Sequence, residues 1–251
     1  MHHEHGFDWM LLLPLPFIGG LMLYVGLLLA TKRPWPLHRT LFAVLGTLSA
    51  VSAVTGPIAE LAHTNFVYHM LGHLLLGMLA PLLFVLAAPM TLCLRTMPVR
   101  WARRLSAVLR SGPSRLVTNP VVASLLNVGG LWVLYKTGLY HLMQTNMLIH
   151  LLVHLHLFLA GYVFTLSMIS LDPVAHRTSY RFRAVVFLLA FAAHSILAKH
   201  LYASPPAGVP LEQARSGSQL MYYGGDLIEL VIIAVLCLQW YRAARPRTSY
   251  N

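Results

Sequence analysis

The stretch FVYHMLGHLLLGMLAPLLFVLAAPMTLCL, residues 66–94, contains no Asp, Glu, Lys or Arg side chain. A helix needs about 20 consecutive apolar residues to cross the hydrocarbon core of a bilayer, so this stretch predicts a transmembrane helix. Six further apolar stretches of similar character occupy residues 10–30, 40–59, 119–135, 146–169, 182–202 and 219–241. The sequence therefore predicts an all-α, polytopic membrane protein with seven transmembrane helices in a single domain, residues 1–251.

The basic side chains indicate how these helices are oriented. Of the 18 Lys and Arg residues, Lys136, Lys199 and Arg215 fall in the connections on one side, and the others fall in the alternate connections and the C-terminal tail. Cytoplasmic loops carry the excess of Lys and Arg. We therefore expect the N-terminus outside and the C-terminus in the cytoplasm, with residues 1–9 as an outer tail, 95–118 as a cytoplasmic loop and 242–251 as a cytoplasmic tail.

The composition favours membrane lipid over nucleic acid as a partner. The chain is 57% hydrophobic and 10% charged, and its net charge of +11 is spread over the predicted cytoplasmic loops and tail. Membrane topology accounts for that charge, so no nucleic-acid partner is expected. In the 95–118 loop, Trp101, Leu105 and Val108 share one helical face and arginines occupy the rest. This pattern predicts an amphipathic helix on the cytoplasmic leaflet, with a docking surface for another protein as the alternative.

Twelve of the fourteen histidines fall on the predicted outer side of the membrane. At about 1.5 Å of helical rise per residue, four ionisable residues on four different helices lie at the same depth, roughly 10–12 Å below the outer ends of their helices. Two more histidines lie one turn above, on the same helix faces, because the spacing is i, i+4. The sequence thus predicts an upper layer of His69 and His150 over a lower layer of His73, His154, His194 and Asp226.

The residue types in these layers point to a metal. Ionisable groups at such depth are costly and usually mark a functional site. Neutral imidazole binds Zn, Cu, Fe and Ni, whereas thioether sulfur favours Cu(I). Methionines near the outer helix ends therefore favour copper as the ion bound by both layers. The outer accessory candidates are His63, His200, Met70, Met147 and Met221.

Other features are less informative about the site. His156 faces away from the His150/His154 face, so packing or an interhelical hydrogen bond explains it at least as well as ligation. The N-terminal MHHEH segment is an outer collecting site for metal, a tag remnant or a terminus without a role. The chain has no GxSxG, HExxH, Walker or Gly-rich dinucleotide motif, so no enzymatic activity is expected.

Two segments resemble the signatures of a known family. They are HMLGHLLLGMLAPLLFVLAAPMTLCLRTMP, residues 69–98, and HLLVHLHLFLAGYVFTLSMISLDP, residues 150–173, followed by HRTSYRFR. Both are similar to the CtaG family of assembly factors for caa3-type cytochrome c oxidase. The resemblance implies a multi-pass protein of the bacterial inner membrane that supplies copper to the oxidase, at the subunit with the copper-B centre, with an outer-side copper donor as a further partner.

The same resemblance bears on individual residues. His69 and His73 match the family's histidine pair on the third span, His150 matches the histidine that opens the fifth span, and His194 matches one in the sixth. In the seventh span the family shows Asp-Gln before a Gly-Gly pair. Here Ser218-Gln219 precedes Gly224-Gly225, which leaves the role of Asp226 open.

Two alternative functions remain. Histidines on facing helices are suitable axial ligands for haem, so a haem-binding membrane protein is one alternative. A transporter of metal ions or protons is the other. Against the transporter, the inner halves of the predicted spans contain almost no ionisable residues that would form a path to the cytoplasm.

Overall fold

The computed structural model describes residues 12–169, 171–172 and 178–245, and every regular element within these ranges is helical. The predicted outer tail, its histidines and the end of the predicted cytoplasmic tail lie outside the described residues. The helices are α1 Leu15–Ala30, α2 Leu37–Val54, α3 Gly56–Ala62, α4 Phe66–His73, α5 Ala80–Ala87, α6 Pro89–Thr96, α7 Val99–Leu109, α8 Gly112–Val117, α9 Pro120–Ser124, α10 Gly130–Lys136, α11 Leu139–Thr145, α12 Met147–Met168, α13 Tyr180–Ala203 and α14 Leu211–Ala244. A π-helical turn, Leu74–Leu79, joins α4 to α5, and a second, Leu125–Gly129, joins α9 to α10.

Five helical runs are long and apolar enough to cross a membrane, judged by length and composition: Leu37–Val54, Phe66–Thr96, Met147–Met168, Tyr180–Ala203 and Leu211–Ala244. The remaining two predicted spans form shorter apolar helices, Leu15–Ala30 and Pro120–Lys136. The described residues therefore form an all-α, multi-pass membrane protein. The count of seven spans and the orientation stay predictions.

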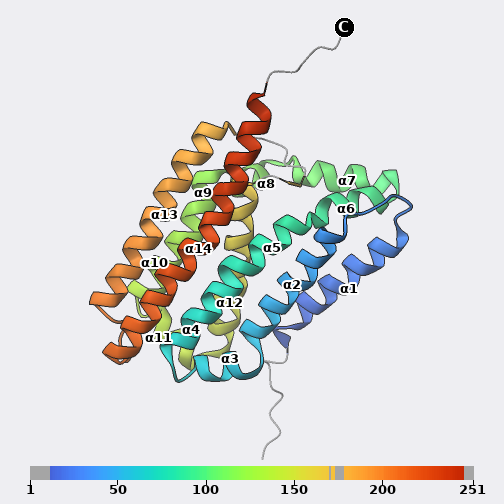
Figure 1. Ribbon diagram of the computed structural model, residues 1–251. Helices are drawn as coiled ribbons and strands as arrows, with labels where there is room; N and C mark the ends of the chain where they lie inside the picture. Colours follow the sequence, from blue (N-terminus) through green and yellow to red (C-terminus); the bar gives the residue numbers. More distant parts are fainter. Residues whose placement is uncertain (1–11, 170, 173–177, 246–251) are drawn as a thin grey trace, which may run out of the picture.

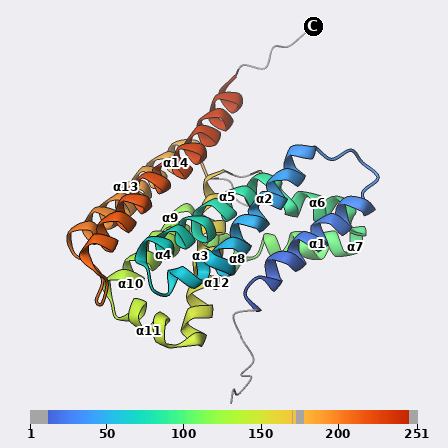
Figure 2. The ribbon, with the colours of Figure 1, turned by 60° about the horizontal axis from the view of Figure 1, so that its bottom comes forward.

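The run from α4 to α6 lies at the centre of the helical bundle. It contacts α2, α12 and α14, and α13 packs along α14 on the far side (Figure 1). Helices α3 and α11 lie at one end of the bundle, and α7 lies across the opposite end (Figure 1); Figure 2 shows the bundle with the α3 and α11 end turned forward. Side chains that face inward from α4, α12, α13 and α14 therefore meet between helices distant in sequence.

The π-helical turn Leu74–Leu79 brings α12 unusually close to the central run. Pro81 has no N–H to donate to the carbonyl of Gly77, so the regular hydrogen-bond ladder is interrupted there. The N–H of Ala80 instead donates to Leu75 five residues earlier, and the Ser49 hydroxyl of α2 donates to the same carbonyl at 3.0 Å. On α12, Gly161 approaches so closely that a Cβ atom there would overlap the Gly77 carbonyl. Small residues at this crossing allow the two backbones to touch.

A buried carboxylate from a distant loop caps helix α6. The N-cap residue of α6 is Ala88, which adopts a left-handed conformation with φ 51°. Its methyl side chain cannot accept a hydrogen bond from the helix. Asp172 supplies that acceptor: it receives the Met90 N–H at 3.2 Å, the Thr91 N–H at 2.8 Å and the Thr91 hydroxyl at 2.7 Å. Burial raises the pKa of the Asp172 carboxyl above its ordinary value, and the hydrogen bonds from Thr91 and Met90 oppose this effect.

We expect Asp172→Ala to destabilise the fold by about 1–3 kcal/mol, the typical cost of leaving buried polar groups without a partner. The measurement is the thermal unfolding temperature of the purified protein in detergent. Glu212→Ala is the control, because the Glu212 side chain is exposed at the start of α14. Equal unfolding temperatures for both variants would contradict a capping role for Asp172.

Helix α7, Val99–Leu109, lies within the predicted 95–118 loop. Helix α7 exposes Trp101 and Val108, and the guanidinium group of Arg104 lies 4.9 Å from the centroid of the Trp101 ring. Contact of this helix with a cytoplasmic leaflet stays a prediction.

Candidate functional site

Four histidines line one small cavity near the end of the bundle that carries α3 and α11. They are His63 at the C-terminus of α3, His69 on α4, and His150 and His154 on α12, and we call them the outer cluster. The cavity has a volume of about 20 Å³, and Met143 and Gln144 also line it. A polar cavity must offer roughly 10–15 Å³ to hold one water molecule, so this one has room for a single small ion or water.

The three rings from α3 and α12 form a stack. The ring centroids of His63 and His150 are 5.4 Å apart, and those of His150 and His154 are 4.2 Å apart. Neutral imidazoles stack in this way without the repulsion that protonated rings would have. The stack therefore presents several ring nitrogens around one cavity.

Hydrogen bonds fix the orientation of two of these rings. His154 Nδ1 lies 2.9 Å from the backbone carbonyl of His150. A carbonyl can only accept, so Nδ1 carries the proton and Nε2 keeps its lone pair. His69 Nε2 lies 3.0 Å from the Tyr135 hydroxyl, which in turn lies 3.7 Å from the Met70 sulfur. Such partners set the tautomer and angle of a metal-binding histidine.

A second group of ionisable side chains lies deeper, between α4, α13 and α14. We call His73, His194 and Glu229 the core cluster; their exposed fractions are 4%, 2% and 3%. The rings of His73 and His194 have centroids 6.0 Å apart, and His194 Nδ1 lies 3.8 Å from Glu229 Oε2. Both ring nitrogens of each histidine and Oε2 of Glu229 have no hydrogen-bond partner among the described residues.

Glycines allow the helices of the core cluster to come together. A Cβ atom on Gly225 of α14 would lie 2.6 Å from His194 Cε1, and one on Gly77 would lie 3.3 Å from His73 Nδ1. Larger residues at either position would push a histidine ring aside. The glycines thus place both rings where α4, α13 and α14 meet.

The structure groups the predicted residues differently from the two layers expected from depth. His154 stacks on His150 in the outer cluster and does not lie with His73 and His194. The reason is that depth along a helix does not determine the direction in which a side chain points. Asp226 lies on α14, half-buried, one turn before Glu229 and within electrostatic range of Lys199.

The accessory candidates are mostly separate from both clusters, and His63 is the exception. His200 stacks on Trp132, with ring centroids 6.2 Å apart, and its Nε2 lies close to Lys136 Nζ at 2.6 Å. Met70 and Met221 are buried in the apolar core, and Met147 does not line the outer cavity. His156, as the spacing indicated, makes an interhelical contact, with Nε2 3.1 Å from the Leu126 carbonyl.

Glu229 was not selected from the sequence, and Met143 entered only as one of the methionines near the outer helix ends. Glu229 is one of few acids in the outer halves of the spans, and its i, i+3 spacing from Asp226 could have identified it. Met143 lies in the short helix α11, outside any predicted span, so only the fold brings it to the cavity.

The clusters are not preformed metal sites. Within the described ranges, no group of three or more His, Cys, Asp or Glu side chains is placed so that it could hold a metal ion. Ligation in either cluster therefore requires side chains to rotate from their present positions. Which of the predicted ligands bind copper stays a prediction.

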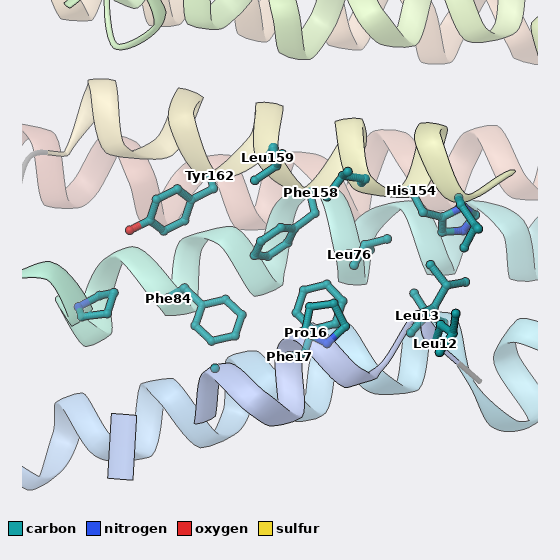
Figure 3. A pocket seen from close by; sticks show the side chains of 15 residues that line it. Leu12, Leu13, Pro16, Phe17, Leu76, Phe84, His154, Phe158, Leu159 and Tyr162 are labelled. Carbon is teal, nitrogen blue, oxygen red and sulfur yellow. The ribbon is translucent and has the colours of Figure 1, made fainter. Parts of the chain in front are cut away.

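The outer cluster adjoins an apolar groove of about 540 Å³ between α1 and α12. Figure 3 shows His154 at one end of this groove, beside Leu12 and Leu13, and Tyr162 at the other end. Phe17 and Phe158 lie between them and pack edge to face, with ring centroids 4.9 Å apart. His154 lines both this groove and the outer cavity, so the cluster has an apolar side that is open laterally.

Comparison with known proteins agrees with the resemblance seen in the sequence. The sequence profile of the family described as cytochrome c oxidase caa3 assembly factor (Caa3_CtaG) matches residues 22–243. An uncharacterized protein of Mycobacterium leprae is 24% identical over 83% of this chain, and uncharacterized proteins of Mycobacterium bovis and Mycobacterium tuberculosis are each 25% identical over 86%. The chain spans about a third of the length of these relatives, 35–36%. No solved structure matches it significantly. With the family profile extending over most of the helical bundle, the chain belongs to the caa3 cytochrome c oxidase assembly factor family.

Proposed function

We propose that this protein holds copper in the outer cluster, near the outer face of a bacterial inner membrane, and delivers it to the copper-B subunit of a caa3-type cytochrome c oxidase. The observation that carries the proposal is the outer cavity. Four histidines from three helices surround a space of about 20 Å³, and the tautomer of His154 leaves its Nε2 unprotonated. Family membership connects the site with oxidase assembly.

The ligand types in the cavity favour copper as the cargo. Imidazole nitrogen suits copper and zinc, whereas thioether sulfur favours Cu(I). Met143 lines the cavity beside the histidines. Imidazole binds a metal in its neutral form and thioether carries no charge, so a monovalent ion adds the least uncompensated charge to this poorly solvated region. Together these features favour Cu(I) in the outer cluster.

The position of the cavity is suited to transfer within the membrane. His154 lies between the cavity and the apolar groove of α1 and α12 (Figure 3). An ion leaving past His154 reaches the side of the bundle, where another membrane protein can approach. Phe17 and Phe158 line this side and exclude water from it. The route does not require the ion to cross to the cytoplasm.

A strain lacking this protein tests the proposal. We expect its cytochrome oxidase to be synthesised and to contain haem but to be short of copper and poorly active. A plasmid copy with His69→Ala should fail to restore activity, whereas His156→Ala should restore it, because His156 contacts the Leu126 carbonyl outside the outer cluster. Copper in the isolated oxidase is measured by mass spectrometry, and haem by its optical spectrum.

Two outcomes would contradict the proposal. Oxidase with full copper and normal activity in the deletion strain would exclude a role in copper supply. A Soret band in the purified assembly factor would favour the haem-binding alternative, in which histidines serve as axial ligands.

A further inference from the structure

The core cluster contains more unpaired polar atoms than a packed membrane interior normally tolerates. Four imidazole nitrogens, on His73 and His194, and one oxygen of Glu229 are buried without a hydrogen-bond partner among the described residues. Buried polar groups in native proteins are almost always paired, and an exception requires an explanation such as a bound ion or water. A cluster of five such atoms on three different helices indicates a site for a ligand.

The spacing of the two imidazoles fits a single metal ion. Metal–nitrogen bonds are about 2.0–2.1 Å long, which places a ligated ring centroid roughly 3 Å from the ion. Two imidazoles that bind one ion therefore have centroids about 5–6 Å apart, the shorter value for tetrahedral ligands and the longer for ligands on opposite sides of the ion. The observed separation of His73 and His194 is 6.0 Å.

Glu229 is close enough to act as a third ligand. Ligand atoms around a tetrahedral ion are roughly 3.4 Å apart when the bonds are about 2.1 Å long. His194 Nδ1 and Glu229 Oε2 are 3.8 Å apart. A small rotation of the Glu229 side chain brings them to that spacing, and the unpaired Oε2 has no hydrogen bond to another described residue that would have to break first.

The charge of Glu229 distinguishes this cluster from the outer one. A cation transferred into a poorly solvated interior is unfavourable unless an opposite charge accompanies it. The outer cavity is lined by imidazoles and a thioether, whereas the core cluster contains a carboxylate. Two imidazoles and one carboxylate are typical ligands of divalent transition metals, and no sulfur lies among them to favour Cu(I).

We propose that His73, His194 and Glu229 form a second, separate metal site that binds a divalent transition-metal ion, with Glu229 as its anionic ligand. His69 of the outer cluster and His73 lie on one face of α4, four residues apart, which corresponds to about 6 Å of helical rise. The two sites are thus neighbours on α4 but use different ligands from the other helices. The core site does not depend on the proposed delivery of copper to an oxidase.

The test uses the full-length protein, purified without a polyhistidine tag. His2, His3 and His5 of the MHHEH segment and His69 and His154 of the outer cluster are all replaced by Ala, so that neither of these histidine groups binds the added metal. After addition of Cu(II) and gel filtration, we expect one tightly bound ion per chain, with nitrogen hyperfine structure from two imidazoles in its electron paramagnetic resonance spectrum. Adding Glu229→Gln, which preserves size but removes the charge, should abolish this ion. Adding His194→Gln should do the same.

Glu212→Gln in the same background is the matched control, because Glu212 is exposed on the same helix, α14, and it should retain the ion. The same test can be made in protein whose outer cluster is intact. There, Glu229→Gln should lower the amount of bound Cu(II) by one ion per chain. Retention of that ion by both Glu229→Gln and His194→Gln would overturn the core site. Loss of the ion in these variants while the deletion strain makes fully active oxidase would instead overturn only the proposed function.

Discussion

His154→Ala is expected to weaken Cu(I) binding by the outer cluster by at least about 10-fold, since even the loss of an outer-shell partner of a metal ligand typically costs 10–100-fold in affinity. Several contacts fix the position of the His154 ring. Its Nδ1 is bound to the His150 carbonyl, its ring stacks on His150, and it separates the outer cavity from the apolar groove. Alanine removes the proposed ligand and opens the cavity to the groove at the same time.

The affinity is measured by competition with a coloured Cu(I) chelator under anaerobic conditions. His156→Ala is the matched control on the same helix, two residues further along, where the ring contacts the Leu126 carbonyl. We expect this control to bind Cu(I) like the wild type. If both variants lose copper equally, the effect comes from disturbance of α12 and the outer cluster is not the site.

Gly161→Ala is expected to destabilise the fold by about 3 kcal/mol, the upper end of the usual cost of overpacking. The added Cβ would overlap the carbonyl of Gly77, which is backbone and cannot move aside as a side chain can. Helix α12 must therefore shift away from the π-helical turn Leu74–Leu79. Because His150 and His154 are on α12 and His69 is on α4, the shift should also widen the outer cavity and weaken copper binding.

Thermal unfolding in detergent measures the first effect, and the chelator competition measures the second. Gly129→Ala is the control, because a Cβ atom at Gly129 meets nothing within 4 Å. Its unfolding temperature should stay the same or rise slightly, since alanine is the better helix former. An unchanged unfolding temperature for Gly161→Ala would mean that α12 and the central run are not in close backbone contact.

Much of the fold follows from local properties of the sequence. The length of an apolar stretch can be compared with the thickness of a bilayer. This comparison identified all five helical runs that are long and apolar enough to cross a membrane. The helical period alone places His69 with His73, and His150 with His154, on common faces, because residues four apart lie about one turn apart. The family signatures are likewise continuous segments, and the match over residues 22–243 confirmed them.

The grouping of the histidines does not follow from local properties in the same way. Depth along a helix can be counted from the sequence, but the rotation of a helix about its axis depends on its neighbours. The crossing at Gly77 and Gly161 and the interruption before Pro81 determine how α12 faces α4. These contacts turn the face of α12 that carries His150 and His154 towards His63 and His69, and they leave His73 to face His194.

The sequence by itself therefore determined that this is an all-α membrane protein of an oxidase assembly family, with histidines gathered in the same part of several spans. Tertiary structure alone decided that there are two clusters, and that Glu229, which is three residues beyond the expected Asp226, faces His194. The physical reason is the range of the interactions. Span length and helix faces come from residues near one another in the chain, whereas a shared site requires the relative rotation of helices that only their packing fixes.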